Sequence, residues 1–328
     1  MSSDSRLLAP EPRVAAARGI GPGGDGFGVA VPARTGRGVV GRFLRHRVAS
    51  VSLLFLGLLA VAATTAPMFL ADEVSPSLTR TVTAEAREGP SLDHLFGTDQ
   101  LGRDQLARVL AGVRKSLVIG LGVAAVSALV GAAIGALAGW YGGWVDSLLM
   151  RFTDLVLVLP GLAVLLIVAT NPHPSFFGLF DFPPATEVGG MIVVLSLLGW
   201  MPMARIVRGE TLSLREREFV DAARASGASG PRIILRHLLP NAIGSVIVFA
   251  TLSVGFAILE EATLSFLGAG IQAPDVSLGS LVASAEQTVG TRLAYLVYLP
   301  GVVLFLIVLA VNFVGDGLRD ALDPRAHR

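Results

Sequence analysis

The chain has 328 residues, of which 52% are hydrophobic and only 16% are charged, and its formal net charge is +1. Soluble domains carry about 25% charged residues, so this composition predicts a protein of the lipid bilayer, and the small net charge gives no reason to expect nucleic-acid binding. Cysteine is absent, which excludes disulfides and thiolate metal sites.

The first 47 residues differ from the rest of the chain. They are rich in Gly, Pro, Ala and Arg and show no apolar periodicity, so we expect residues 1–47 to form a disordered cytoplasmic tail. The G-x-G-x-x-G match at Gly19, Gly21 and Gly24 neither follows a predicted strand nor opens a helix, so it does not indicate a dinucleotide site. The apolar segment at 48–70 follows a leader too long for a signal peptide, which favours a retained transmembrane helix.

Six segments meet the requirement of about 20 mostly apolar residues for crossing a bilayer. We therefore predict an all-α integral membrane protein with six transmembrane helices. The segments are residues 49–70, 116–140, 147–169, 188–203, 241–262 and 293–313. The distribution of Lys and Arg near their ends places both termini in the cytoplasm.

Two of the predicted external loops contain helical patterns. In the loop at 71–115, apolar residues recur at helical spacing and predict an amphipathic interfacial helix over 98–117 that runs into the second span. In the loop at 268–293, a similar pattern predicts a short helix. The residues that carry the two patterns are Leu106, Val109, Leu110, Val113 and Leu117, and Leu281, Val282, Ala285 and Val289.

The cytoplasmic loop at 204–240 predicts a helix–turn–helix. Leu212 and Phe219 fall on one helical stripe with Ala222 or Ala223. Gly227 stands where a helix end requires a residue that accepts a positive φ.

The second helix of this loop has its own start signals. Ser229 offers an N-cap and Pro231 falls in its first turn. That helix is expected to run to Leu239, with Pro240 marking the start of the fifth span. The small side chains of Ala222, Ala223 and Ala225 would let a partner surface approach the backbone closely.

The same loop resembles the E-A-A-x3-G-x9-I-x-L-P loop of permease subunits of bacterial ABC importers. The matching residues are Ala222, Ala223, Gly227, Leu239 and Pro240, with Asp221 in place of the Glu and His237 in place of the Ile. Residues 97–104, 264–268 and 315–324 further resemble the C-type permease of dipeptide, oligopeptide and nickel importers, and the resemblance covers residues 40–325.

This resemblance implies a type I ABC importer permease, with a core at 116–325 that holds five of the spans. Such a subunit sits in the bacterial plasma membrane and forms half of a translocation pathway with a second homologous permease. Two ABC ATPase subunits bind ATP and Mg below the permeases, the loop docks on one of these ATPases, and an external binding protein delivers the cargo. The implied cargo is a dipeptide or oligopeptide, with nickel or a small solute such as haem as the alternative.

The chain itself carries no predicted catalytic, cofactor or metal site. It lacks the P-loop, H-E-x-x-H and G-x-S-x-G motifs, and its histidines do not pair at helical spacing. ATP hydrolysis is therefore expected in the separate ATPase subunits. A membrane scaffold without transport activity and an intramembrane enzyme are the alternatives from other functional classes.

Ionisable residues within membrane spans are costly and mark functional candidates. Glu260 and Glu261 are candidates for a pathway or gate, and since adjacent helical positions point about 100° apart, at most one of them faces the pathway squarely. Solvation at the outer interface is the alternative for both. Arg151 and Asp154 predict a local ion pair at i, i+3. Two residues near the end of the sixth span, Asn312 and Asp316, are expected to be helix-end polar groups.

Overall fold

The computed structural model describes residues 39–69, 86–171, 175–176, 180–181, 183–273 and 275–322, with the side chains of 67–69, 175–176 and 180–181 left out. The chain divides into two units, Met1–Arg37 and Gly38–Arg328, and all described residues belong to the second unit. Most of the predicted tail and the first third of the first external loop (residues 71–85) lie outside the described residues. The end of the predicted tail forms α1 (Val39–Phe43), whose Phe43 is buried beside α12.

Five continuous helices are long and apolar enough to cross a membrane, and a bent pair supplies a sixth candidate. The continuous ones are α2 (Arg47–Phe69), α4 (Gln105–Tyr141), α7 (Val188–Arg215), α9–α10 (Gly230–Phe266) and α12 (Tyr295–Leu322). Two short strands, β1 (Ser175–Phe176) and β2 (Phe180–Asp181), pair as an antiparallel hairpin. The expected all-helical membrane architecture is confirmed.

The third predicted span is broken. Residues 147–169 form α5 (Gly143–Val158) and α6 (Gly161–Ala169), which meet at an angle of 83°. Pro160 lies at the break, and Leu159 before it is extended, with φ −66° and ψ 143°. Proline lacks the backbone N–H that would continue the helix and disfavours helical geometry in the preceding residue, which explains the bend.

The helix α4 contains both the predicted interfacial helix and the second span, into which that helix was expected to run. The interfacial helix over 98–117 and the second span form one continuous helix of 37 residues, which begins at Gln105. Asp104 provides its N-cap, with the carboxylate accepting from Ala107 N at 2.9 Å. The short helix predicted in the last external loop is confirmed as α11 (Leu278–Ser284), followed by a 3₁₀ turn at Glu286–Thr288.

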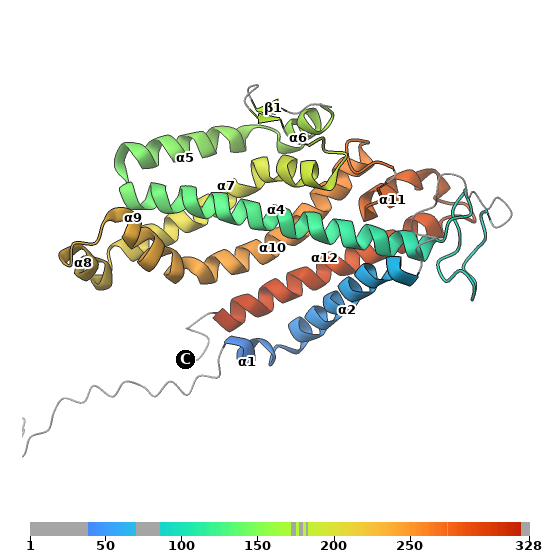
Figure 1. Ribbon diagram of the computed structural model, residues 1–328, viewed down its shortest axis with the longest axis horizontal. Coiled ribbons are helices and arrows are strands. Elements are labelled where there is room, and N and C mark those ends of the chain that lie inside the picture. The colour runs from blue at the N-terminus through green and yellow to red at the C-terminus, as the bar shows by residue number, and fades with distance from the viewer. Residues whose placement is uncertain are drawn as a thin grey trace, which may run out of the picture. The chain divides into compact units, whose positions relative to one another are not determined.

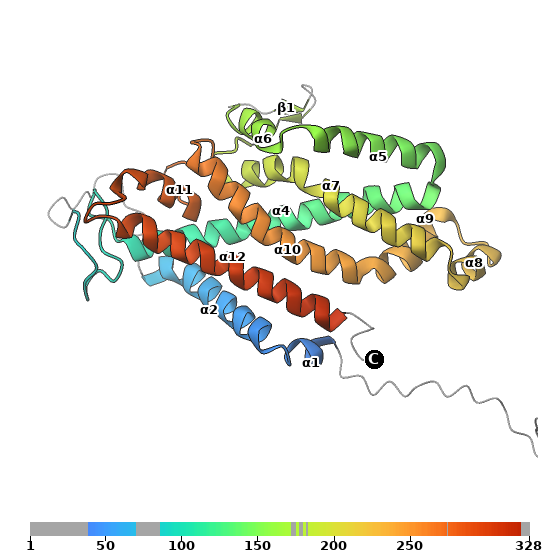
Figure 2. The ribbon, with the colours of Figure 1, turned by 180° about the vertical axis from the view of Figure 1, so that it is seen from behind.

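The long helices pack in layers. Figures 1 and 2 show α2 and α12 on one side, α5 and α6 on the opposite side, and α4, α7 and α10 between them. The closest packing is between α4 and α7, where a Cβ on Gly131 or Gly135 would come within 2.5 or 2.3 Å of a carbonyl oxygen of α7. Small residues at such four-residue spacing let membrane helices approach closely.

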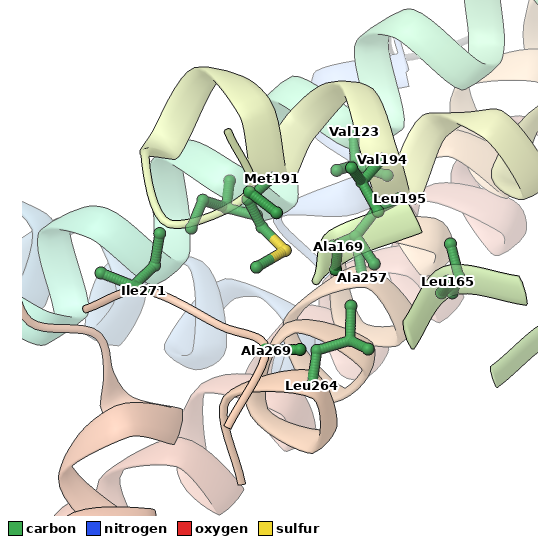
Figure 3. Close-up of a cluster of buried hydrophobic side chains, with 12 residues drawn as sticks. Val123, Leu165, Ala169, Met191, Val194, Leu195, Ala257, Leu264, Ala269 and Ile271 are labelled. Atoms are coloured by element: carbon green, nitrogen blue, oxygen red, sulfur yellow. The ribbon is translucent and has the colours of Figure 1, made fainter. Parts of the chain in front are cut away.

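A cluster of buried apolar side chains joins the bent pair to the middle layer. Figure 3 shows Leu165 and Ala169 of α6 with side chains of α4, α7 and α10. Leu195 is fully buried at its centre and Met191 is likewise inaccessible. The cluster holds α6, the second half of the bent pair, against α7.

Candidate functional site

The loop between α7 and α10 folds as the predicted helix–turn–helix, at the end of the bundle opposite α11 (Figures 1 and 2). Its first helix is α8 (Glu218–Ala225), and Gly227 follows with φ +79°, as expected for a left-handed cap. Ser229 occupies the N-cap of α9 (Gly230–Ile233) with extended backbone, although its side chain makes no capping bond. Pro231 lies in the first turn, where its missing N–H costs nothing.

One side chain anchors α8 to the bundle. Val220 is fully buried in a cluster with Ile233, Met203 and Val207. Phe219, which the sequence places on one helical stripe with Leu212, has a side chain that is 39% exposed. The helical periodicity that includes Leu212 does not continue into α8, because α7 ends at Arg215 and α8 begins a new helix at Glu218.

The outward face of α8–α9 is a shallow hollow of about 460 Å³. Ala222 is exposed at the hollow, whereas Ala223 is half-buried against the cluster around Val220. Asp221 is exposed and bonds Arg224 at 3.0 Å. The hollow is lined by Phe219, Ala222, Ala223, Ser226, Ala228, Arg232, Arg236 and His237. Short side chains on its floor and basic groups on its rim leave room for a docking helix or loop.

The second helix of the loop does not stop at Leu239, contrary to prediction. It passes through a π-helical turn (Ile234–Leu238) directly into α10 (Leu239–Phe266). Pro240 has no N–H to offer, and the π turn shifts the register so that Leu239 N bonds Ile234 O. Asn241 Nδ2 donates to His237 O at 2.6 Å. The α9 segment and the fifth span are therefore one continuous helical stretch.

The loop is also tied to the end of α4. The guanidinium of Arg224 lies 4.9 Å from the ring centroid of Trp140, and Arg215 Nη1 donates to the carbonyl oxygens of Gly139 and Trp140 at 3.2 and 3.4 Å. A Cβ on Gly230 would lie 2.8 Å from Trp140 Nε1. These contacts were not predicted, because they join residues about 80 positions apart.

The ion pairs nearby join α5 to α7. Asp154 pairs with Arg205 of α7, and Asp146 accepts from Arg208 Nε at 2.5 Å and Nη2 at 2.6 Å. The predicted local pair of Arg151 with Asp154 is not the arrangement found. Since α5 lies alongside α7, an arginine of the neighbouring helix reaches the carboxylate instead.

Glu260 and Glu261 lie in different environments. Glu261 is fully buried, and its Oε1 accepts from Ser265 Oγ at 2.7 Å and Ser277 Oγ at 2.6 Å. Its Oε2 accepts from Ser116 Oγ at 3.4 Å. Glu261 thereby joins α4, α10 and the start of α11.

Glu260 is exposed and faces a membrane-depth cavity of about 490 Å³. The two adjacent carboxylates thus face different surroundings, and a pathway or gate role for either stays a prediction. Of the two polar groups expected at the end of the sixth span, Asp316 is exposed, but α12 continues to Leu322, so both lie within the helix. Asn312 instead faces Gly255 of α10, where a Cβ would lie 3.5 Å from its Oδ1.

The segment at 97–104 forms a compact turn beside α4 and α12. The Asp99 carboxylate accepts from Arg103 N at 2.9 Å and from Arg108 Nη1 at 2.7 Å. Tyr295 Oη of α12 donates to the carbonyl oxygens of Glu88 and Thr98 at 2.7 Å. The segment therefore closes the loop onto the bundle.

Comparisons with known proteins agree with this architecture. Residues 131–328 match the family described as binding-protein-dependent transport system inner membrane component. The chain is 42% identical over 289 residues to the oligopeptide transport system permease protein OppC of Mycobacterium bovis, covering 87% of this chain and 93% of that protein. It is 40% identical over 304 residues to a Brucella suis protein whose name describes a peptide permease, covering 92% and 95%.

A solved structure shares the fold. The inward-facing MetNI methionine ABC transporter superposes with a TM-score of 0.53 at 20% identity, covering 66% of this chain and 97% of that one. This likeness confirms the expected fold class. The chain belongs to the family of binding-protein-dependent transport system inner membrane components and is a permease component of an ABC importer.

Proposed function

We propose that this chain forms half of the pathway of a peptide importer, together with a second homologous permease, and that α8–α9 docks on an ATPase subunit. The names of the relatives, which describe oligopeptide and peptide permeases, support a dipeptide or oligopeptide as cargo. Neither name mentions nickel or haem, which are the alternative cargoes.

The observation that carries the coupling role is the exposed face of α8. In this helix only Val220 is buried, and Ala222 faces the hollow. With Val220 as its one buried side chain, α8 is fixed in place while its outer face stays exposed. A docking element needs such an exposed face. Its continuity through α9 into α10 gives a docked ATPase a direct mechanical connection to a membrane span.

The proposed orientation follows from the charges of this end. The loop 204–240 carries seven arginines, and positive residues near span ends favour the cytoplasmic side. The α8 end then faces the ATPases, with ATP and Mg bound in those subunits, and both chain termini are cytoplasmic. The external binding protein approaches the opposite end, where α11 and the turn at 97–104 lie.

The function is tested by reconstituting this chain with its second permease, ATPases and binding protein in proteoliposomes. We expect ATP-dependent accumulation of a labelled oligopeptide and no accumulation of nickel or haem. A complex that lacks this chain is the control and should accumulate nothing. ATP-dependent accumulation of nickel or haem with no peptide uptake would contradict the proposed cargo.

A further inference from the structure

The cavity beside Glu260 lies between the bent pair and the middle layer of helices. Its volume is about 490 Å³, which is within the range of small-molecule sites. The walls are apolar and come from α4, α5, α6, α7 and α10, with Leu165, Leu198 and Phe256 among them. Because the break at Pro160 separates α5 from α6, both halves of the bent pair contribute to one wall.

Glu260 is the single charged residue among those that line the cavity. None of the described residues donates a hydrogen bond to its carboxylate or forms an ion pair with it, whereas the neighbouring Glu261 receives three serine hydroxyls. A carboxylate at membrane depth is costly unless it faces water or meets a partner. The carboxylate of Glu260 is therefore a hydrogen-bond acceptor in the cavity wall that is available to a ligand.

Ser127 of α4 provides a second unused polar group in the same lining. It is only 2% exposed, and its hydroxyl oxygen has no hydrogen-bond partner among the described residues. The other hydroxyls of the lining are occupied: Ser253 Oγ donates to Phe249 O and Thr263 Oγ1 to Leu259 O, both at 2.8 Å. Buried polar groups are normally paired, so an unpaired one facing a cavity points to a ligand.

We propose that this cavity binds the ammonium group of the transported peptide, with Glu260 receiving the positive charge and Ser127 meeting a polar group of the backbone. The inference rests on the proposed peptide cargo. An ionised carboxylate is an acceptor only, so its ligand must be a donor or a cation. One carboxylate without further charged ligands is a poor site for a divalent metal, whereas apolar walls suit the side chains of a peptide.

The experiment measures ATP-dependent uptake of an amine-bearing oligopeptide by the full reconstituted complex. Three variants are compared with the wild type: Glu260→Gln, Glu260→Asp and Thr263→Val. Because E260Q removes the charge that strengthens the hydrogen bond to an ammonium, we expect it to lower uptake at subsaturating peptide about tenfold or more. E260D, which keeps the charge, should retain most of it.

Thr263→Val is the matched control because it lies in the same cavity and on the same helix. Its hydroxyl already donates to the Leu259 carbonyl of its own helix and is not offered to a ligand, so uptake should remain within about twofold of wild type. Unchanged uptake in E260Q, or an equal loss in all three variants, would overturn the proposal. So would failure of E260Q to assemble with the second permease, because Glu260 would then serve the subunit interface.

A second measurement identifies the ligand group. A zero-length carbodiimide joins an amine to a carboxylate only when the two touch. We expect a peptide adduct at residue 260 in the wild-type complex and none in E260Q, detected by mass spectrometry. Reduced uptake in E260Q without an adduct in the wild type would overturn the assignment of the ammonium. If the wild-type complex imports no peptide at all, the proposed cargo fails rather than the cavity.

Discussion

The two ends of the helical bundle are built differently. At one end, α11 is held by buried side chains, with Leu278 and Leu281 inaccessible and Glu261 bonded to three serines. At the other end, α8 contributes a single buried side chain, Val220. A densely bonded element keeps its place without help, whereas a sparsely attached one is free to respond to a partner. The difference supports the proposal that an ATPase subunit docks at the α8 end.

The largest effect on stability is expected from removing the Glu261 carboxylate, which accepts hydrogen bonds from three serines near α11. Glu261→Ala leaves three buried serine hydroxyls without their acceptor, and each unpaired group costs about 1–3 kcal/mol. We therefore expect a loss of stability of about 3 kcal/mol or more, measured as a lower thermal midpoint of the purified protein in detergent.

Glu260→Ala is the matched control, since the adjacent carboxylate has no partner among the described residues. Its thermal midpoint should remain close to that of the wild type. Equal losses in the two variants would show that the serine network does not hold the α11 end together.

A second comparison uses two helical glycines. A Cβ on Gly279 of α11 would lie 2.4 Å from Ala262 Cα, while one on Gly209 of α7 would meet nothing within 4 Å. Gly279→Ala should cost about 1–3 kcal/mol through overpacking, and Gly209→Ala should be neutral or stabilise by up to about 1 kcal/mol. Thermal unfolding of both variants measures these changes. An unchanged thermal midpoint in Gly279→Ala would show that α11 is not tightly packed against α10.

The membrane spans and the cap at Gly227 could be predicted from the sequence because their signals are local. Apolar length identified the spans, and Gly227 was correctly placed at a left-handed cap because its signal is local. The break at Pro160 was missed, since a run of apolar residues conceals a bend. Val220 was missed because the phase of α8 is set by where α7 ends.

The candidate sites divide in the same way. The alanines of α8 follow a short pattern that the sequence displays directly. The partners of Glu261, by contrast, come from α4, α10 and the segment before α11. No local sequence pattern indicates contacts between residues so far apart in the chain. Glu260 and Glu261 therefore could not be told apart from the sequence, although one is exposed and the other buried.

The smallest of these effects concerns the tie between the loop and α4. Trp140→Ala removes the ring beneath Arg224, and a cation–π contact at an exposed site is worth about 0.5–1 kcal/mol. We expect faster hydrogen exchange at 218–233 with little change in thermal midpoint. Trp144→Ala is the control, because that side chain is 77% exposed. Unchanged exchange in W140A would show that the contact between Arg224 and Trp140 does not hold the loop.

The most direct test of coupling compares two alanines of α8 in the reconstituted complex. Ala222 lines the hollow, whereas Ala225 is exposed but lies outside its lining. Ala222→Arg should abolish stimulation of ATP hydrolysis by loaded binding protein, because an arginine there would obstruct a docked ATPase, and Ala225→Arg should leave most of it. Normal stimulated hydrolysis in A222R would contradict the central claim that this face of α8 couples ATPase to permease.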